Sequence, residues 1–123
     1  MPTRILKAER NLDLYVGWSR TVNSPLFWGT RSEVAKQLQE SAPYGVAWAS
    51  PERIEEHLAR ADRTGTTALR AVGAWDGRLI YKQRGMLPHR NLTELIRRLD
   101  ADENDPVTDL LEPFDDEPKV RQP

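Results

Sequence analysis

The residue types that most often carry catalysis or bind metals are scarce in this chain of 123 residues. It contains no cysteine and only two histidines, His57 and His89, so a thiolate site is excluded and a zinc site has too few ligands. Glu55, Glu56 and His57 are consecutive on a predicted helix, and consecutive helical side chains point apart rather than toward one substrate. The sequence therefore predicts no metal and no cofactor.

Phosphate-binding loops and catalytic pairs are also missing from the sequence. None of the seven glycines belongs to a GxGxxG or GxxxxGK arrangement, the loops that cradle phosphates. Neither a nucleophile beside a base nor a pair of carboxylates at catalytic spacing is recognisable. We therefore expect a protein that is not an enzyme, and an enzyme of unknown class is the third interpretation.

The first candidate binding surface is one face of a predicted β-hairpin. Asp76-Gly77 lies between residues 71–75 and 78–82, and this dipeptide favours a two-residue type I′ turn, in which both central residues have positive φ. In that register Val72 and Tyr81 are neighbours in the core. The opposite face then carries Ile80, one tryptophan and three basic residues. The candidate binding residues on it are Trp75, Arg78, Lys82 and Arg84.

This hairpin face has two interpretations. Arg and Lys side chains can follow phosphates while an indole stacks on a base, as in proteins that bind single strands. Alternatively, the face is only solvated, and Arg78 lies over Trp75 as a cation–π pair. A winged-helix arrangement is disfavoured, because Pro43 and Gly45 stand where the recognition helix would follow.

The second candidate surface lies in an acidic tail. Residues 1–99 carry 16 Lys and Arg against 10 Asp and Glu, a charge of +6, whereas residues 100–123 carry two against nine, a charge of −7. We therefore place a boundary near Asp100, between a compact basic domain (1–99) and an acidic, proline-containing tail that is flexible or docked (100–123). Three large apolar residues stand among the acids of the tail: Leu110, Leu111 and Phe114. Such a segment can dock in a groove of a partner or fold back on its own basic body.

Alternating apolar residues predict the strands that must position these surfaces. Residues 12–19 alternate in the manner of a half-buried strand, with Trp18 on the apolar side. Residues 26–28 are expected to return as its partner, and residues 4–7 to supply an edge strand. A further short strand is predicted at residues 44–48.

Capping signals predict three helices. Thr30 with Glu33, and Asn91 with Glu94, have the spacing of a capping box. The middle helix starts at Ser50-Pro51 and is expected to stop at Gly65. The predicted fold is therefore α+β, a small antiparallel sheet with two or three covering helices, plus the acidic C-terminal tail.

Composition also suggests a setting for the protein. The N-terminus lacks a signal-peptide pattern and no window is apolar enough for a membrane span, so we expect a cytoplasmic protein without a membrane partner. Fourteen of the 18 basic residues are arginine, a bias that goes with GC-rich coding sequence and indicates a high-GC bacterium or its phage. The leading interpretation is a non-catalytic interaction protein that binds another macromolecule, most readily a protein. The alternative is a nucleic-acid-binding protein whose acidic tail is autoinhibitory.

Overall fold

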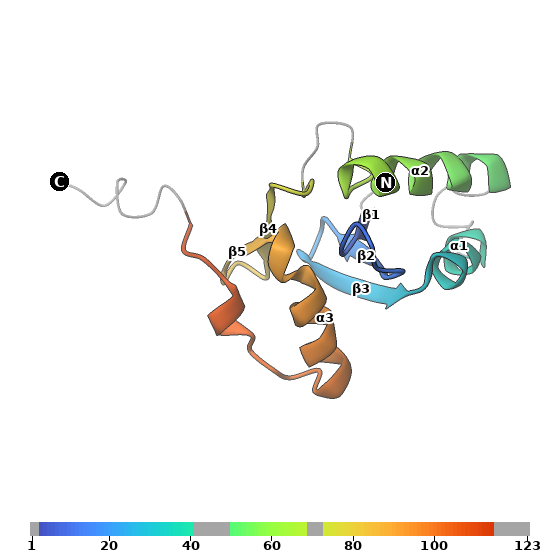
Figure 1. The fold of residues 1–123 in the computed structure, drawn as a ribbon. Helices are drawn as coiled ribbons and strands as arrows, with labels where there is room; N and C mark the ends of the chain where they lie inside the picture. Colours follow the sequence, from blue (N-terminus) through green and yellow to red (C-terminus); the bar gives the residue numbers. More distant parts are fainter. Residues whose placement is uncertain (1–2, 41–49, 69–72, 115–123) are drawn as a thin grey trace.

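Two small antiparallel sheets and three α-helices make up the fold (Figure 1). The computed structural model describes residues 3–40, 50–68 and 73–114. In chain order the elements are β1 (Thr3–Lys7), β2 (Tyr15–Ser19), β3 (Ser24–Gly29), α1 (Arg31–Glu40), α2 (Pro51–Thr64), β4 (Arg78–Tyr81), β5 (Gly85–Pro88), the 3₁₀ turn η3 (His89–Asn91), α3 (Leu92–Ala101) and the 3₁₀ turn η4 (Thr108–Leu110). The predicted α+β class is confirmed. Within these ranges no helix is both long and apolar enough to cross a membrane.

The larger sheet has β2 at its centre, between β1 and β3. The strands predicted at residues 4–7 and 26–28 are thereby confirmed. All five residues of β2 are buried, so the prediction of a half-buried strand is wrong. The physical reason is that both faces of the sheet are covered: Tyr15 packs with residues of α1 and α2, whereas Val16 and Trp18 pack with residues of α3 and the smaller sheet.

The two faces of this sheet support two separate cores, which give three layers (Figure 1). The first core lies between the sheet and helices α1 and α2, and its buried members are Ile5, Tyr15, Val34, Leu38, Ile54 and Leu58. The second core lies between the other face, α3, the β4–β5 hairpin and the C-terminal segment, and includes Leu6, Val16, Trp18, Tyr81, Leu95, Val107 and Leu110. Burying each of these large side chains contributes about 1.5 to 3 kcal/mol.

The first two helices begin as predicted. The Thr30 amide donates to Glu33 Oε1 over 2.8 Å, and the Glu33 amide donates to Thr30 Oγ1 over 3.2 Å, which confirms the capping box. Ser50 Oγ accepts from the Arg53 amide before α2, and Gly65 ends that helix with a φ of 89°. The strand predicted at residues 44–48 lies outside the described residues.

The third helix has a different start from the predicted capping box. Asn91 is the last residue of η3, with φ −95° and ψ 2°, so its side chain makes no cap hydrogen bond. It donates instead to the carbonyl oxygen of Leu110 over 2.9 Å. Glu94 pairs with Arg97 and Arg98. The predicted Asn91–Glu94 box is therefore wrong, because the chain enters α3 from a 3₁₀ turn rather than from an extended residue.

The β-hairpin turns at a different place from the predicted one. Strand β4 pairs with β5, and the turn between them places Lys82 at φ 48° and Gln83 at φ 60°. A turn does form at Asp76-Gly77, where the Gly77 amide donates to the Ala74 carbonyl over 2.7 Å. Neither residue there has the positive φ that a type I′ turn requires, so the predicted turn and register are wrong. Tyr81 is buried as predicted, and Val72 lies outside the described residues.

The C-terminal segment, residues 107–112, packs against α3 and the second core and reaches the outer edge of β5 at Glu112. The amide and carbonyl of Glu112 each bond to Met86 over 2.7 Å, as in an added strand. Arg98 pairs with Asp109, and Val107 is fully buried despite a φ of 48°. A β-branched residue with this φ is an outlier that the surrounding packing must hold in place.

A substitution at Gly85 tests how tightly this segment is docked. A Cβ atom at Gly85 would lie 2.7 Å from the carbonyl oxygen of Glu112, so Gly85→Ala must displace that backbone. We expect a loss of about 1 to 3 kcal/mol in the free energy of unfolding, with faster hydrogen exchange at the Glu112 amide. Urea unfolding and amide exchange measure the two effects. An unchanged Glu112 exchange rate would contradict the docked arrangement.

Candidate functional site

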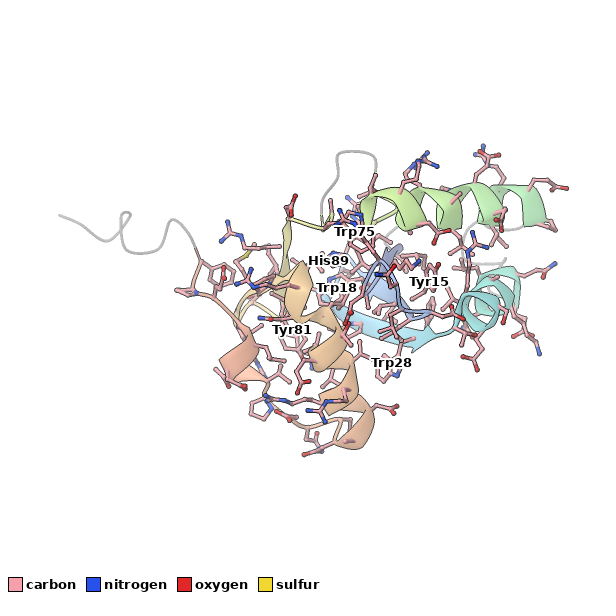
Figure 2. The ribbon with its side chains drawn as sticks, in the orientation of Figure 1. Tyr15, Trp18, Trp28, Trp75, Tyr81 and His89 are labelled. Carbon is pink, nitrogen blue, oxygen red and sulfur yellow. The ribbon has the colours of Figure 1, made fainter. Side chains whose placement is uncertain are left out.

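The tryptophan of the predicted hairpin face lies away from the hairpin turn. Trp75 Nε1 donates to the Arg63 carbonyl at the end of α2 over 2.9 Å, and its ring meets that of His89 at a centroid distance of 5.0 Å (Figure 2). The guanidinium of Arg10 lies 4.9 Å from the Trp75 ring centroid. The cation–π partner of Trp75 is thus Arg10, not the predicted Arg78.

The basic residues of that predicted face are divided between two places. Arg78 and Arg90 both pair with Glu112 of the C-terminal segment, at 3.5 and 3.2 Å. Lys82 and Arg84 are exposed in the β4–β5 turn, at the other end of β4 from Trp75. The structure therefore brings Lys82 and Arg84 together but does not bring Trp75 to them.

The apolar residues of the tail are turned toward the body. Leu110 is buried in the second core, and Leu111 packs against that core while partly buried. Phe114 is partly buried. Two of these three predicted contact residues are therefore occupied within the molecule.

A new candidate surface forms where two turns meet. The Lys82 amide donates to the Asn23 carbonyl over 2.9 Å, which joins the β4–β5 turn to the β2–β3 turn; Figure 1 shows the start of β3 beside the β4–β5 hairpin. Three apolar side chains at these turns and on the strands that leave them are exposed: Val22 at 55%, Leu26 at 53% and Ile80 at 41%. With Arg20, Lys82 and Arg84 they form what we call the turn-end surface.

The turn-end surface is built from chain segments that contain no acid. Residues 3–8, 14–32 and 77–93 include neither Asp nor Glu. Among the described residues no carboxylate pairs with Lys82 or Arg84, and Lys82 instead lies 5.3 Å from the Tyr81 ring centroid. The absence of Asp and Glu from these stretches is visible in the sequence. The alternation of apolar and polar residues, however, does not show that the two turns touch.

A separate polar cluster joins the first-core elements near the start of α1. Asp62 accepts a hydrogen bond from the Tyr15 hydroxyl and pairs with Arg31 at 3.2 Å and with Lys7 at 3.7 Å. Burial, then the bond to Asp62, raises the pKa of Tyr15 to about 12. Burial opposes ionisation of Asp62, but Tyr15 and Arg31 outweigh it and lower its pKa. Both groups keep their ordinary charge at neutral pH, so the cluster stabilises the fold rather than transferring protons.

This cluster makes stability depend on alkaline pH. Because the pKa of Tyr15 is raised in the folded protein to about 12, its contribution is complete below the ordinary tyrosine pKa of about 10 and is lost as the pH rises toward 12. We expect a loss of about 1 to 2 kcal/mol over that range that Tyr15→Phe does not show. Urea unfolding at several pH values measures it. If the free energy of unfolding changes with pH by the same amount in the unmodified protein and in Tyr15→Phe, this assignment is contradicted.

Within the described ranges no group of three or more His, Asp or Glu side chains is placed to hold a metal ion. Comparison with known proteins found no matching family model, no matching curated protein and no matching solved structure. The residues of the chain itself therefore carry the functional argument.

Proposed function

We propose that this chain is a non-catalytic interaction protein that binds another protein through the turn-end surface. The observation that carries the proposal is the hydrogen bond that joins the two turns, because three of the four large exposed apolar residues among the described ones lie in these turns or within three residues of that bond. These three are Val22, Leu26 and Ile80, and Leu12 lies elsewhere. Exposed apolar residues that gather with polar ones at their rim are typical of interaction sites. The setting is the cytoplasm of a high-GC bacterium or its phage.

The charge of the surface specifies the chemistry of the partner. Lys82 and Arg84 are exposed and have no carboxylate to neutralise them within the described residues. A partner surface of aliphatic side chains rimmed by Asp and Glu would cover the apolar residues and complement the cations. The acids would raise the association rate and the apolar contacts would slow dissociation.

A nucleic-acid partner is the alternative, and the structure bears on it through two contacts. Trp75, the ring expected to stack on a base, is packed against His89 and Arg10, away from Lys82 and Arg84. Arg78 and Arg90 are held by Glu112. Glu112→Gln keeps the backbone pairing to Met86 and removes the carboxylate that both arginines share. It therefore suits a test of tail autoinhibition better than a deletion after Leu99, which removes the buried Val107 and Leu110.

Photo-crosslinking from position 22 tests the proposed function, with position 12 as the matched control because Leu12 is also exposed. We expect a crosslinked protein from position 22 only, joined through a segment that contains both acidic and aliphatic residues. Ile80→Asp or Lys82→Glu is expected to reduce the yield at least tenfold. Equal yields from both positions, or no effect of these substitutions, would overturn the proposal.

Titration with oligonucleotides at low salt tests the alternative. Single- and double-stranded DNA and RNA are added to the unmodified protein and to Glu112→Gln. If the partner is a protein, we expect neither the unmodified protein nor Glu112→Gln to bind any of these nucleic acids. Salt-sensitive binding that Glu112→Gln strengthens and Lys82→Glu weakens would replace the proposal with a nucleic-acid-binding function.

A further inference from the structure

Strand β4 leaves one edge of the smaller sheet open. It pairs with β5 on one side and, within the described ranges, with no strand on the other. The backbone N–H and C=O groups along an unpaired edge can bond to a strand from another chain. The capacity of this edge depends on which residues of β4 direct those groups outward.

Ile80 directs both of its backbone groups toward the open edge. It lies opposite Met86 in the antiparallel register, and the amide and carbonyl of Met86 both bond to Glu112, away from β4. Opposite residues of an antiparallel pair exchange either two bonds or none. Ile80 and Met86 therefore exchange none, and the N–H and C=O of Ile80 face away from β5.

Bonds on either side of Ile80 agree with this direction. The Gly77 carbonyl accepts from the His89 amide over 3.0 Å, so residues an odd number of positions from Ile80 bond toward β5. The Lys82 amide, two positions from Ile80, donates to the Asn23 carbonyl on the outer side over 2.9 Å. No residue of the described ranges bonds to the Ile80 backbone on that side, and the Ile80 side chain is exposed.

The other three sheet edges are poorer templates for an added strand. The β1 edge is covered after α2, where the Ile5 amide bonds to Thr67 Oγ1 over 3.0 Å and the Ile5 carbonyl accepts from the Thr67 amide over 2.9 Å. The β5 edge is occupied by Glu112. Strand β3 contains Pro25, which has no N–H, and its register with β2 is irregular, and both features protect an edge.

We propose that the partner of the turn-end surface binds through an extended segment that adds a strand to β4 at Ile80. This inference rests on the proposed function for the source of the segment and adds how the segment is recognised. Two backbone bonds between Ile80 and one residue of the segment set the register, and an aliphatic side chain of that residue packs on the Ile80 side chain. An acid two positions away meets Lys82 and Arg84, which pair with no carboxylate among the described residues.

A second copy of this chain fits the open edge less well. A two-fold pair of β4 strands centred on Ile80 would place the Arg78 end of each copy against the Lys82 end of the other. Like charges that lie opposite each other on paired strands are destabilising. Residues 78–88 contain no Asp or Glu to offset this repulsion. Charge therefore favours an acidic, aliphatic segment over a second copy.

NMR titration of the full chain with a synthetic peptide tests the added strand. The probe is acetyl-Thr-Glu-Thr-Val-Thr-Glu-Thr-amide, in which the valine and both glutamates share one face. In the free protein we expect the Ile80 amide to exchange with water about tenfold faster than the Leu79 amide, or more, because Leu79 bonds to β5. The peptide is expected to shift the Ile80 amide signal saturably and to slow its exchange about tenfold. Equal exchange of the two amides in the free protein, or no saturable shift, would overturn the proposal.

Two methylated peptides separate backbone pairing from side-chain docking. N-methylation of the central valine removes the N–H that bonds to the Ile80 carbonyl, and is expected to weaken binding about tenfold. N-methylation of the threonine after it changes the edge that faces away from β4, and is expected to weaken binding less than about threefold. Equal affinities of the two methylated peptides would contradict the pairing of backbones.

Two charge variants test the contact with acids. Lys82→Glu is expected to weaken peptide binding about tenfold. Lys36→Glu makes the same charge change at an exposed residue of α1 and should leave binding unchanged. Equal effects of the two substitutions would show a response to net charge alone and overturn the assignment to β4. Protection of the Ile80 amide that rises with protein concentration and needs no peptide would assign the edge to a second copy instead.

The added strand and the proposed function can fail separately. Peptide binding at Ile80 without any crosslink from position 22 would support the β4 edge and overturn the protein partner. A crosslinked partner that leaves the exchange of the Ile80 amide unchanged would support the partner and overturn strand addition.

Discussion

Replacing His89 with alanine is expected to lower the free energy of unfolding by about 3 kcal/mol, the largest loss for any polar residue of the described part. His89 is buried, with Nδ1 2.5 Å from the Gly73 carbonyl oxygen and Nε2 2.7 Å from the Lys7 carbonyl oxygen. A neutral ring donates to one of these oxygens and a protonated ring to both. Without the ring, at least one of these carbonyl groups loses its donor and a cavity opens beside Trp75.

Urea unfolding of His89→Ala and His57→Ala checks this expectation. His57 lies on the flank of α2 and is only partly buried, so its replacement is expected to cost less than about 1 kcal/mol. The tryptophan fluorescence of folded His89→Ala should also change, because the Trp75 indole loses its ring neighbour. Equal losses for the two variants would contradict the role given to His89.

Leu110→Ala is expected to cost about 2 to 3 kcal/mol and to release the C-terminal segment. Leu110 is buried in the second core, and its carbonyl oxygen accepts the bond from Asn91. Ion pairs alone cannot hold the segment, because exposed pairs contribute about 1 kcal/mol or less and are screened by salt. The sequence predicts an apolar contact of Leu110, Leu111 and Phe114 with a partner or with the body. For Leu110 and Leu111 the receptor is the body of the same chain.

Hydrogen exchange separates release of the segment from general destabilisation. In Leu110→Ala the Glu112 amide, which bonds to Met86, should exchange much faster, whereas amides of β2 should follow the smaller global change. Phe114→Ala is the matched control, and we expect it to cost less than about 1 kcal/mol. A Glu112 amide that is protected equally in both variants would contradict this account.

Local signals in the sequence predicted the helices well and the second sheet poorly. Thr30, Glu33, Ser50 and Gly65 act within one helical turn of themselves, so their roles follow from spacing alone. The position of the hairpin depends on which strands pair, and tertiary contacts decide that pairing. Asp76-Gly77 is a strong turn signal, yet the reversal occurs at Lys82 and Gln83, whose left-handed conformation no residue preference predicts.

The candidate surface shows the same division between local and tertiary information. Lys82 and Arg84 were predicted as binding residues, and they are exposed in the turn. Val22 and Leu26 were missed, because alternation says which residues face a core but not which turns meet. Trp75 was assigned to this surface through a register that does not form.

The two cores differ in how far along the chain their members are spread. The first core draws its buried residues from Ile5 to Leu58, whereas the second begins at Leu6 and is completed only by Val107 and Leu110. During synthesis the ribosome releases the chain from the N-terminus onward, and folding can begin on the part already released. The first core can therefore close while later residues are still being added, but one face of the sheet, with Val16 and Trp18, stays uncovered until the β4–β5 hairpin and α3 have emerged. Val107 and Leu110 complete this second core last. For that interval the nascent chain presents an apolar sheet face, and a chaperone that binds such faces would meet it there.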